Sequence, residues 1–291
     1  LRYTKVDERW MNSLSLEAIE TGIDCWDRDI QRFVRSRRIS EYHPFTAYFE
    51  QLPEWDGTDR VSALARRVSD DPVWVNGFHR WMLGLSAQWM QLNPDNNRAN
   101  SVAPLLVSSR QGLGKSTFCR LLMPDRLKSY YTESYDLSSP ASAEAKLAAY
   151  GLINLDEFDK LGASKMPLLK NLMQASALNI RKAYKHSASS LPRIASFIGT
   201  SNRFDLLTDP TGSRRFLCIE VKHDIDCTGI EHDRIFAQLK AELIAGRRSW
   251  FTKSEEEELQ RHNEAFYRVS LAEEAVRSLF RAPLPAEKSI D

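Results

Sequence analysis

Cysteine is scarce in this sequence, and its spacing excludes two classes of small fold. The 291 residues include four cysteines, with no CxxC pair and no cysteine and histidine at zinc-ligand spacing. We therefore expect neither a zinc site nor a disulfide framework. The thiols are expected to stay reduced and to fill the core; they are Cys25, Cys119, Cys218 and Cys227.

Long apolar runs are missing as well, and so is an excess of one charge. No stretch approaches the roughly 20 apolar residues that a membrane span needs. The start, Leu1-Arg2-Tyr3, has neither a signal core nor an initiator methionine, so we expect a fragment of a longer cytoplasmic protein without a membrane partner. Lysine and arginine number 40 against 39 acidic residues, a net charge of +1. A nucleic-acid partner would therefore need a local basic patch.

The most informative segment runs from the β-prone stretch 103–107 into two glycines and then Lys-Ser-Thr. The glycines let the backbone curl so that its N–H groups face phosphate oxygens, and a helix beginning near Lys115 adds its positive end. Lys115 would reach the β- and γ-phosphates of ATP, and Ser116 would bind Mg²⁺. Ser109 stands where the full pattern has glycine. The predicted ATP-binding residues are Gln111, Gly112, Leu113, Gly114, Lys115, Ser116 and Thr117; an ordinary glycine turn is the alternative.

Paired carboxylates follow the apolar stretch 151–155, about forty residues after the loop. Asp156 is predicted to hold Mg²⁺ and Glu157 to polarise the water that attacks the γ-phosphate. Alone, such a pair is as often an ordinary turn at a strand end. After a phosphate-binding loop it is typical of a Walker B element.

An asparagine and a pair of arginines lie beside later β-prone stretches. Asn202 comes just after the stretch 193–200 and is predicted to be a sensor that positions the attacking water; an asparagine in a turn is the alternative. Arg214 and Arg215 lie in a glycine-containing turn before the stretch 217–221. They are predicted to be arginine fingers that neutralise the transferring phosphoryl group, with ordinary surface arginines as the alternative.

The order of elements predicts an α/β fold. From Ala103 onward β-prone stretches alternate with helical ones, which is typical of a parallel sheet covered by helices. Helices are expected over 14–38, 60–68 and 73–92, with the tryptophans of the last one in the core, and Ser254 with Glu257 is expected to form a capping box. The expected divisions are an N-terminal helical region over 1–100, an ATPase core over 101–250, and a C-terminal helix and tail over 251–291.

Together these motifs resemble the virulence-associated protein E family, whose ATPase domain is similar to superfamily-three helicases of phages and mobile elements. The resemblance covers about residues 53–270. Its segments are Trp55-Asp56-Gly57 with Arg60, 111–117, Asp156-Glu157, 181–184, Thr200-Ser201-Asn202 and 212–216.

The resemblance implies an additional-strand, AAA+-like P-loop fold with strand order 5-1-4-3-2. It also implies a homo-oligomeric ring, a hexamer, that uses ATP and Mg²⁺ to unwind single-stranded or forked DNA in phage or mobile-element replication. A primase or another domain would lie outside this fragment. The segment 179–186 matches a hairpin that lines the channel of those helicases, so Arg181, Lys182, Tyr184 and Lys185 are expected to grip DNA. A structural role for Arg181 and Tyr184 stays open.

Two other functions share the phosphate-binding loop. A small-molecule kinase would need an acceptor pocket and a lid, and it would have no use for Asn202 or the arginine pair. A nucleotide-binding switch in replication control or phage defence would keep the site with weak turnover, and Ser109 keeps that alternative open.

Overall fold

The computed structural model describes residues 6–39, 42–92, 98–180, 189–207, 210–267 and 279–280. The chain divides into two compact units, Leu1–Ala47 and Tyr48–Asp291. In the first unit, α1 (Glu8–Glu20) and α2 (Asp27–Val34) contact each other, and α3 (Pro44–Glu50) crosses the boundary between the units. The single helical region expected over 14–38 is thus two helices, since Gly22, at a φ of 74°, lies in the turn between them.

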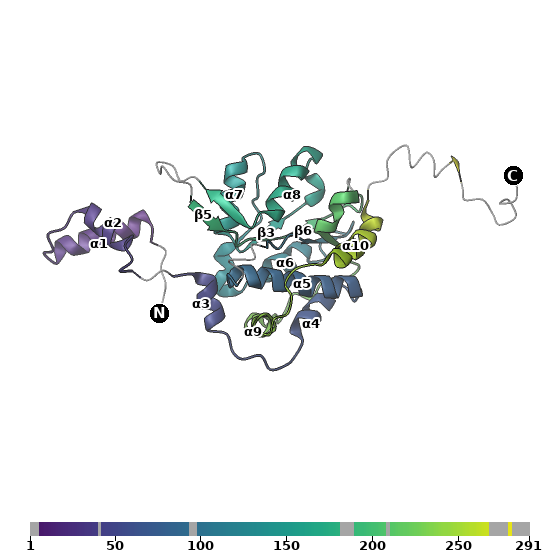
Figure 1. The fold of residues 1–291 in the computed structure, drawn as a ribbon, viewed down its shortest axis with the longest axis horizontal. Helices are drawn as coiled ribbons and strands as arrows, with labels where there is room; N and C mark the ends of the chain where they lie inside the picture. The colour runs from purple at the N-terminus through teal and green to yellow at the C-terminus, as the bar shows by residue number, and fades with distance from the viewer. Residues whose placement is uncertain are drawn as a thin grey trace. The chain divides into compact units, whose positions relative to one another are not determined.

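A five-stranded parallel sheet organises the second unit (Figure 1). Its strand order is β2-β3-β6-β1-β7, and β4 and β5 form a separate hairpin. When the five strands are counted in chain order without the hairpin, the order from the β7 edge is 5-1-4-3-2. The strands of the sheet are β1 (Ala103–Val107), β2 (Tyr131–Thr132), β3 (Leu152–Leu155), β6 (Ser196–Ser201) and β7 (Phe216–Glu220).

Helices cover both faces of the sheet because alternate strand residues point to opposite faces. Figure 1 shows α7 and α8 on one face and α5 and α6 on the other. The α-helices of the second unit are α4 (Arg60–Arg66), α5 (Pro72–Trp89), α6 (Lys115–Leu121), α7 (Pro140–Ala149), α8 (Met166–Gln174), α9 (His232–Ile244) and α10 (Lys253–His262). Its 3-10 helices are η1 (Asp125–Tyr130), η2 (Phe158–Lys160), η3 (Ala163–Lys165), η4 (Pro210–Arg215) and η5 (Asn263–Phe266).

The helix α5 is the most buried helix element of the core. Its three tryptophans have no exposed surface, as the sequence predicted. Trp74 donates a hydrogen bond from Nε1 to the Ala65 carbonyl at 2.8 Å, and the Trp89 ring stacks on Phe236 of α9 at 5.2 Å. The helices α4 and α5, expected in an N-terminal region of residues 1–100, therefore pack within the same unit as the sheet.

The C-terminal helix begins differently from the expectation. Thr252 caps α10, and the Glu255 carboxylate accepts from the Thr252 N–H at 2.6 Å, so the capping box is Thr252 with Glu255 rather than Ser254 with Glu257. Thr252 rather than Ser254 caps the helix because the Thr252 hydroxyl lies just before the first helical turn and accepts a hydrogen bond from the Glu255 N–H.

The hairpin consists of antiparallel β4 (Ala177–Ile180) and β5 (Ser189–Pro192). Its base is described, whereas the predicted DNA-binding residues Arg181, Lys182, Tyr184 and Lys185 lie outside the described residues. Across the described ranges, no helix is both long enough and apolar enough to cross a membrane.

Candidate functional site

The loop between β1 and α6 is curled and anchored. Gly112 and Gly114 have φ angles of 81° and 85°, in the left-handed region that favours glycine. Leu113 between them is buried, and its carbonyl accepts a hydrogen bond from the Ile225 N–H at 3.0 Å. The two glycines thus produce the turn that the sequence predicted, and the segment after β7 holds it in place.

Lys115 begins α6 and is buried beneath this loop, with 7% of its surface exposed. Its Nζ donates to the carbonyls of Ser108 at 3.3 Å and Arg110 at 3.2 Å, and to Asn202 Oδ1 at 3.1 Å. Burial lowers the pKa of Lys115, and the negative charges of Asp156 and Asp159 oppose that shift. The lysine and the predicted sensor, 87 residues apart, are therefore in direct contact.

A hydroxyl and a carboxylate meet beside the lysine. Ser116 donates to Asp156 Oδ1 at 2.9 Å, and Thr200 at the end of β6 donates to the same oxygen at 2.6 Å. These groups are oxygen donors of the kind that Mg²⁺ prefers, and Mg²⁺ commonly takes one or two protein ligands and completes its shell with water and phosphates. Among the described residues no group of three or more His, Cys, Asp or Glu side chains could hold a metal. The donor set therefore fits a nucleotide-bound Mg²⁺ better than a cation held by protein alone.

Glu157 has an unusual backbone, with a φ of 51°. Such a conformation costs a non-glycine residue about 1–3 kcal/mol and persists where its surroundings enforce it. Here the Glu157 N–H donates to Thr200 Oγ1 at 3.3 Å, and Lys160 Nζ lies 2.7 Å from both carboxylate oxygens. The pairing raises the pKa of Lys160. Thr200 of β6 thus holds the Glu157 backbone just after β3 ends.

The sequence did not single out Asp159 or Lys160. Asp159 Oδ1 accepts from Ser201 Oγ at 3.1 Å and from the Asn202 N–H at 3.2 Å, so it positions the residue that contacts Lys115. The available signal was a further charged pair two residues after Asp156-Glu157. Its role depends on the short helix η2, which local pattern did not predict.

The two arginines lie away from this cluster. They end η4, directly before β7, and β7 runs parallel to β1 with Phe216 opposite Ala103 and Glu220 opposite Val107. The arginines therefore lie at the end of the sheet where its parallel strands begin, which we call the amino edge. The loop lies where the strands end, which we call the carboxyl edge, about 13 Å away along four strand residues. Arg214 lies 3.6 Å from Glu256 of α10. The fold brings together Lys115, Ser116, Asp156 and Asn202, with Glu157 adjacent, but not the arginines.

With this geometry in hand, comparison with known proteins places the chain in a family. A family model described as the virulence-associated protein E-like domain matches residues 49–268. The chain belongs to this family. The matched range includes the loop, both predicted carboxylates, Asn202 and the arginine pair.

Solved structures give a weaker likeness. The A form of the apo NrS-1 C-terminal region, described as residues 305–718, has 16% sequence identity and a TM-score of 0.43, covering 81% of this chain and 54% of that one. A second A-form structure of this region has 14% identity and a TM-score of 0.44, with 80% and 54% covered. The chain thus spans about half the length of these structures. A search of curated proteins finds no match.

Proposed function

We propose that this chain is a Mg²⁺-dependent ATPase with an additional-strand, AAA+-like P-loop core. It would work as a superfamily-three DNA helicase or translocase in the replication of phage or mobile-element DNA. The observation that carries the proposal is one hydrogen-bonded cluster at the carboxyl edge of a parallel sheet: Lys115 on Asn202, and Ser116 on Asp156. In open parallel sheets that edge is where ligands bind.

Nucleotide binding would exchange the partners of Lys115. Two of its three acceptors are neutral carbonyls, and a phosphate oxygen bearing full charge makes a stronger hydrogen bond to an ammonium. The N–H groups of the loop would face the same phosphates, and the beginning of α6 would add its positive end. Lys115 would then pass from closing the loop to orienting the β- and γ-phosphates of ATP.

Glu157 would accept the proton of the attacking water. A general base must be held within hydrogen-bond reach of that water, and its backbone contact with Thr200 provides the fixed position. Bound Mg²⁺ would supply charge stabilisation on the phosphates, with Ser116 and Asp156 as its protein partners. In the structure, Lys160 pairs with both carboxylate oxygens of Glu157.

The arginines support a site shared between subunits. Since Arg214 and Arg215 precede β7 at the opposite edge of the sheet, they are too far away to neutralise a phosphate on their own loop. We infer that they act on the loop of a neighbouring copy in a homo-oligomeric ring, a hexamer. DNA would be held by Arg181, Lys182, Tyr184 and Lys185, which lie in the sequence between β4 and β5, and a primase or another domain would complete the protein.

A nucleotide-binding switch with little unwinding activity is the second candidate. The contacts of Lys115 favour it, since the ammonium already has three acceptors within the chain and a closed loop opposes nucleotide entry. Ser109, which replaces a glycine of the full loop pattern, would stiffen the same segment.

Phosphate release from ATP and Mg²⁺, with and without single-stranded DNA, separates these functions. We expect turnover that DNA accelerates, and we expect Lys115→Ala to abolish nucleotide binding and turnover. Lys128→Ala is the matched control, because Lys128 is an exposed lysine paired with Asp125 on η1 and should leave turnover unchanged. Binding without turnover would favour the switch, and unimpaired turnover in Lys115→Ala would overturn the site.

A further inference from the structure

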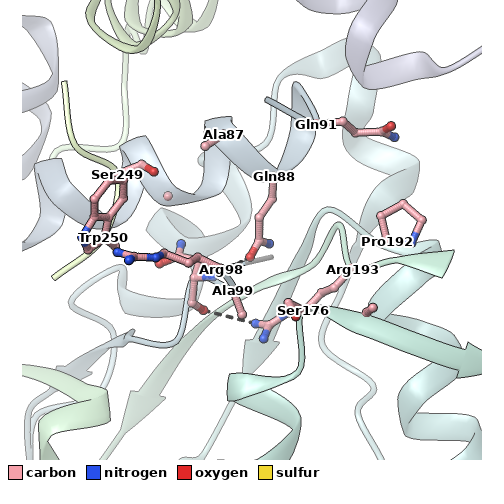
Figure 2. Close-up of a pocket in the computed structure, with 13 residues that line it drawn as sticks. Ala87, Gln88, Gln91, Arg98, Ala99, Ser176, Pro192, Arg193, Ser249 and Trp250 are labelled. Atoms are coloured by element: carbon pink, nitrogen blue, oxygen red, sulfur yellow. Dashed lines mark hydrogen bonds between the residues drawn. The ribbon is translucent and has the colours of Figure 1, made fainter. Parts of the chain in front are cut away.

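A hollow of about 480 Å³ lies near the amino edge of the sheet (Figure 2). Its walls are the C-terminal end of α5, residues 98–100, the base of the β4–β5 hairpin, and Ser249 with Trp250. A second hollow of about 270 Å³ shares residues 98–100 and 249–250 with the first. The larger volume is in the range of ligand sites in proteins. None of the residues in either wall belongs to the loop cluster.

An arginine and a tryptophan form the shared wall. The Arg98 guanidinium lies over the Trp250 ring, 4.4 Å from its centroid, and Figure 2 shows the two side by side at one end of the hollow. Arg98 is exposed and has no ion pair with any residue that the structure describes. Proteins that bind single-stranded nucleic acids use an aromatic face to stack a base and a nearby cation to pair with a phosphate.

The floor adds positive charge that no acid offsets. Arg193 is 3% exposed, and its guanidinium donates to carbonyls alone, including those of Leu172 at 3.0 Å and Asn100 at 3.2 Å. Burial lowers the pKa of Arg193 to about 10, so it remains protonated at neutral pH. The described residues lining the two hollows include two arginines and no aspartate or glutamate, although the chain as a whole has nearly equal numbers of acids and bases. The walls therefore favour an anionic ligand.

We propose that these hollows bind single-stranded DNA, with a base stacked on Trp250 and a neighbouring phosphate paired with Arg98. The hairpin base at Ala177 and Pro192 forms part of the same wall, so the hollow adjoins the hairpin strands. The Arg98 side chain would move from the ring to the phosphate as the base takes its place. This inference does not require the loop cluster to hydrolyse ATP.

Binding of a 5′-fluorescein dT20 oligonucleotide without ATP, measured by anisotropy, tests the proposal. Trp250→Ala should weaken binding by about tenfold, and Trp250→Phe should retain most of the affinity because a stacking face remains. Arg98→Ala should reduce the log–log salt slope by about 0.7, the value for one phosphate contact on a single strand. Trp26→Ala is the control: Trp26 is an exposed tryptophan that also lies under an arginine, Arg28 at 5.4 Å, in the first unit, and its loss should change nothing.

Photo-cross-linking of the unmodified chain to a 5-iodouracil oligonucleotide keeps the test decisive if a variant does not fold. We expect cross-linked peptides to contain Trp250 or residues 98–100. Cross-links confined to other peptides, or wild-type affinity in both Trp250→Ala and Arg98→Ala, would overturn the inference. If dTMP quenches tryptophan fluorescence in the wild type but not in Trp250→Ala, and has no effect on dT20 binding, the hollow is a mononucleotide pocket. That result would also overturn the inference. Cross-linking at Trp250 in a chain without ATPase activity would separate this inference from the proposed function.

Discussion

The surroundings of Lys115 at one edge of the parallel sheet differ from those of Arg193 and Arg98 at the other. At the carboxyl edge, the carboxylates of Asp156 and Asp159 are near enough to Lys115 to influence its pKa. At the amino edge, Arg193 and Arg98 have no carboxylate partner among the described residues, and their contacts are carbonyls and aromatic rings.

This difference fits the separate functions that we propose for the two edges. Hydrolysis of a phosphate needs both signs of charge, because a metal and a base require carboxylates while the phosphate requires cations. Retention of a polyanion needs cations and stacking faces, and nearby carboxylates would oppose it. The contrast supports the two proposals above, hydrolysis of ATP at the carboxyl edge and binding of single-stranded DNA at the amino edge.

The largest effect should come from Arg214 and Arg215, which we propose to act on the loop of a neighbouring subunit. We expect Arg214→Ala with Arg215→Ala to lower ATP turnover by about 10³-fold while ATP still binds, because a finger stabilises charge in the transition state. Mixing this variant with Lys115→Ala should restore measurable phosphate release, since some interfaces then pair an intact loop with intact arginines.

A mixture of Lys115→Ala and Glu157→Gln is the matched control for that experiment. Every loop edge in it is defective, so no activity should return. Light scattering must show that the variants co-assemble. Absence of recovery in co-assembled arginine mixtures would contradict action between subunits.

A smaller effect is expected on stability at the amino edge. Arg193→Met should lower the free energy of unfolding by about 3–5 kcal/mol, because it leaves buried carbonyls unpaired at the end of α8 and before β1. Denaturation followed by circular dichroism measures the change.

Arg203→Met provides the comparison for that measurement. Arg203 pairs with Asp205 at 2.6 Å, but its side chain is 59% exposed, so its loss should cost less than about 1 kcal/mol. If both variants lose the same free energy of unfolding, the hydrogen bonds of Arg193 do not stabilise the amino edge.

The local pattern predicted the geometry of the carboxyl edge. Strand β1 has the predicted bounds, and the glycines, Lys115 and Asp156 lie where short segments leave their strands. The catalytic and binding roles of these residues stay predictions. The contact between Lys160 and Glu157 was not predicted, because it depends on η2. This 3-10 helix follows the left-handed backbone conformation of Glu157.

The amino edge could not be predicted in the same way. Arg193 was assigned to the beginning of a strand, and arginine is almost never fully buried unless it is paired. Apart from Ala195, two residues on, its partners come from α8 and from the segment before β1, so no local pattern contains them. The hollow likewise joins residues near positions 88, 98, 176, 193 and 250.

Turnover by Glu157→Gln tests the central claim most directly, since it asks whether the carboxyl edge performs the chemistry. With Mg²⁺ and single-stranded DNA, we predict that this variant binds ATP like the wild type and hydrolyses it about 100-fold more slowly or worse. Glu264→Gln, which alters an exposed carboxylate on η5, should retain full turnover. Wild-type turnover in Glu157→Gln would contradict the account.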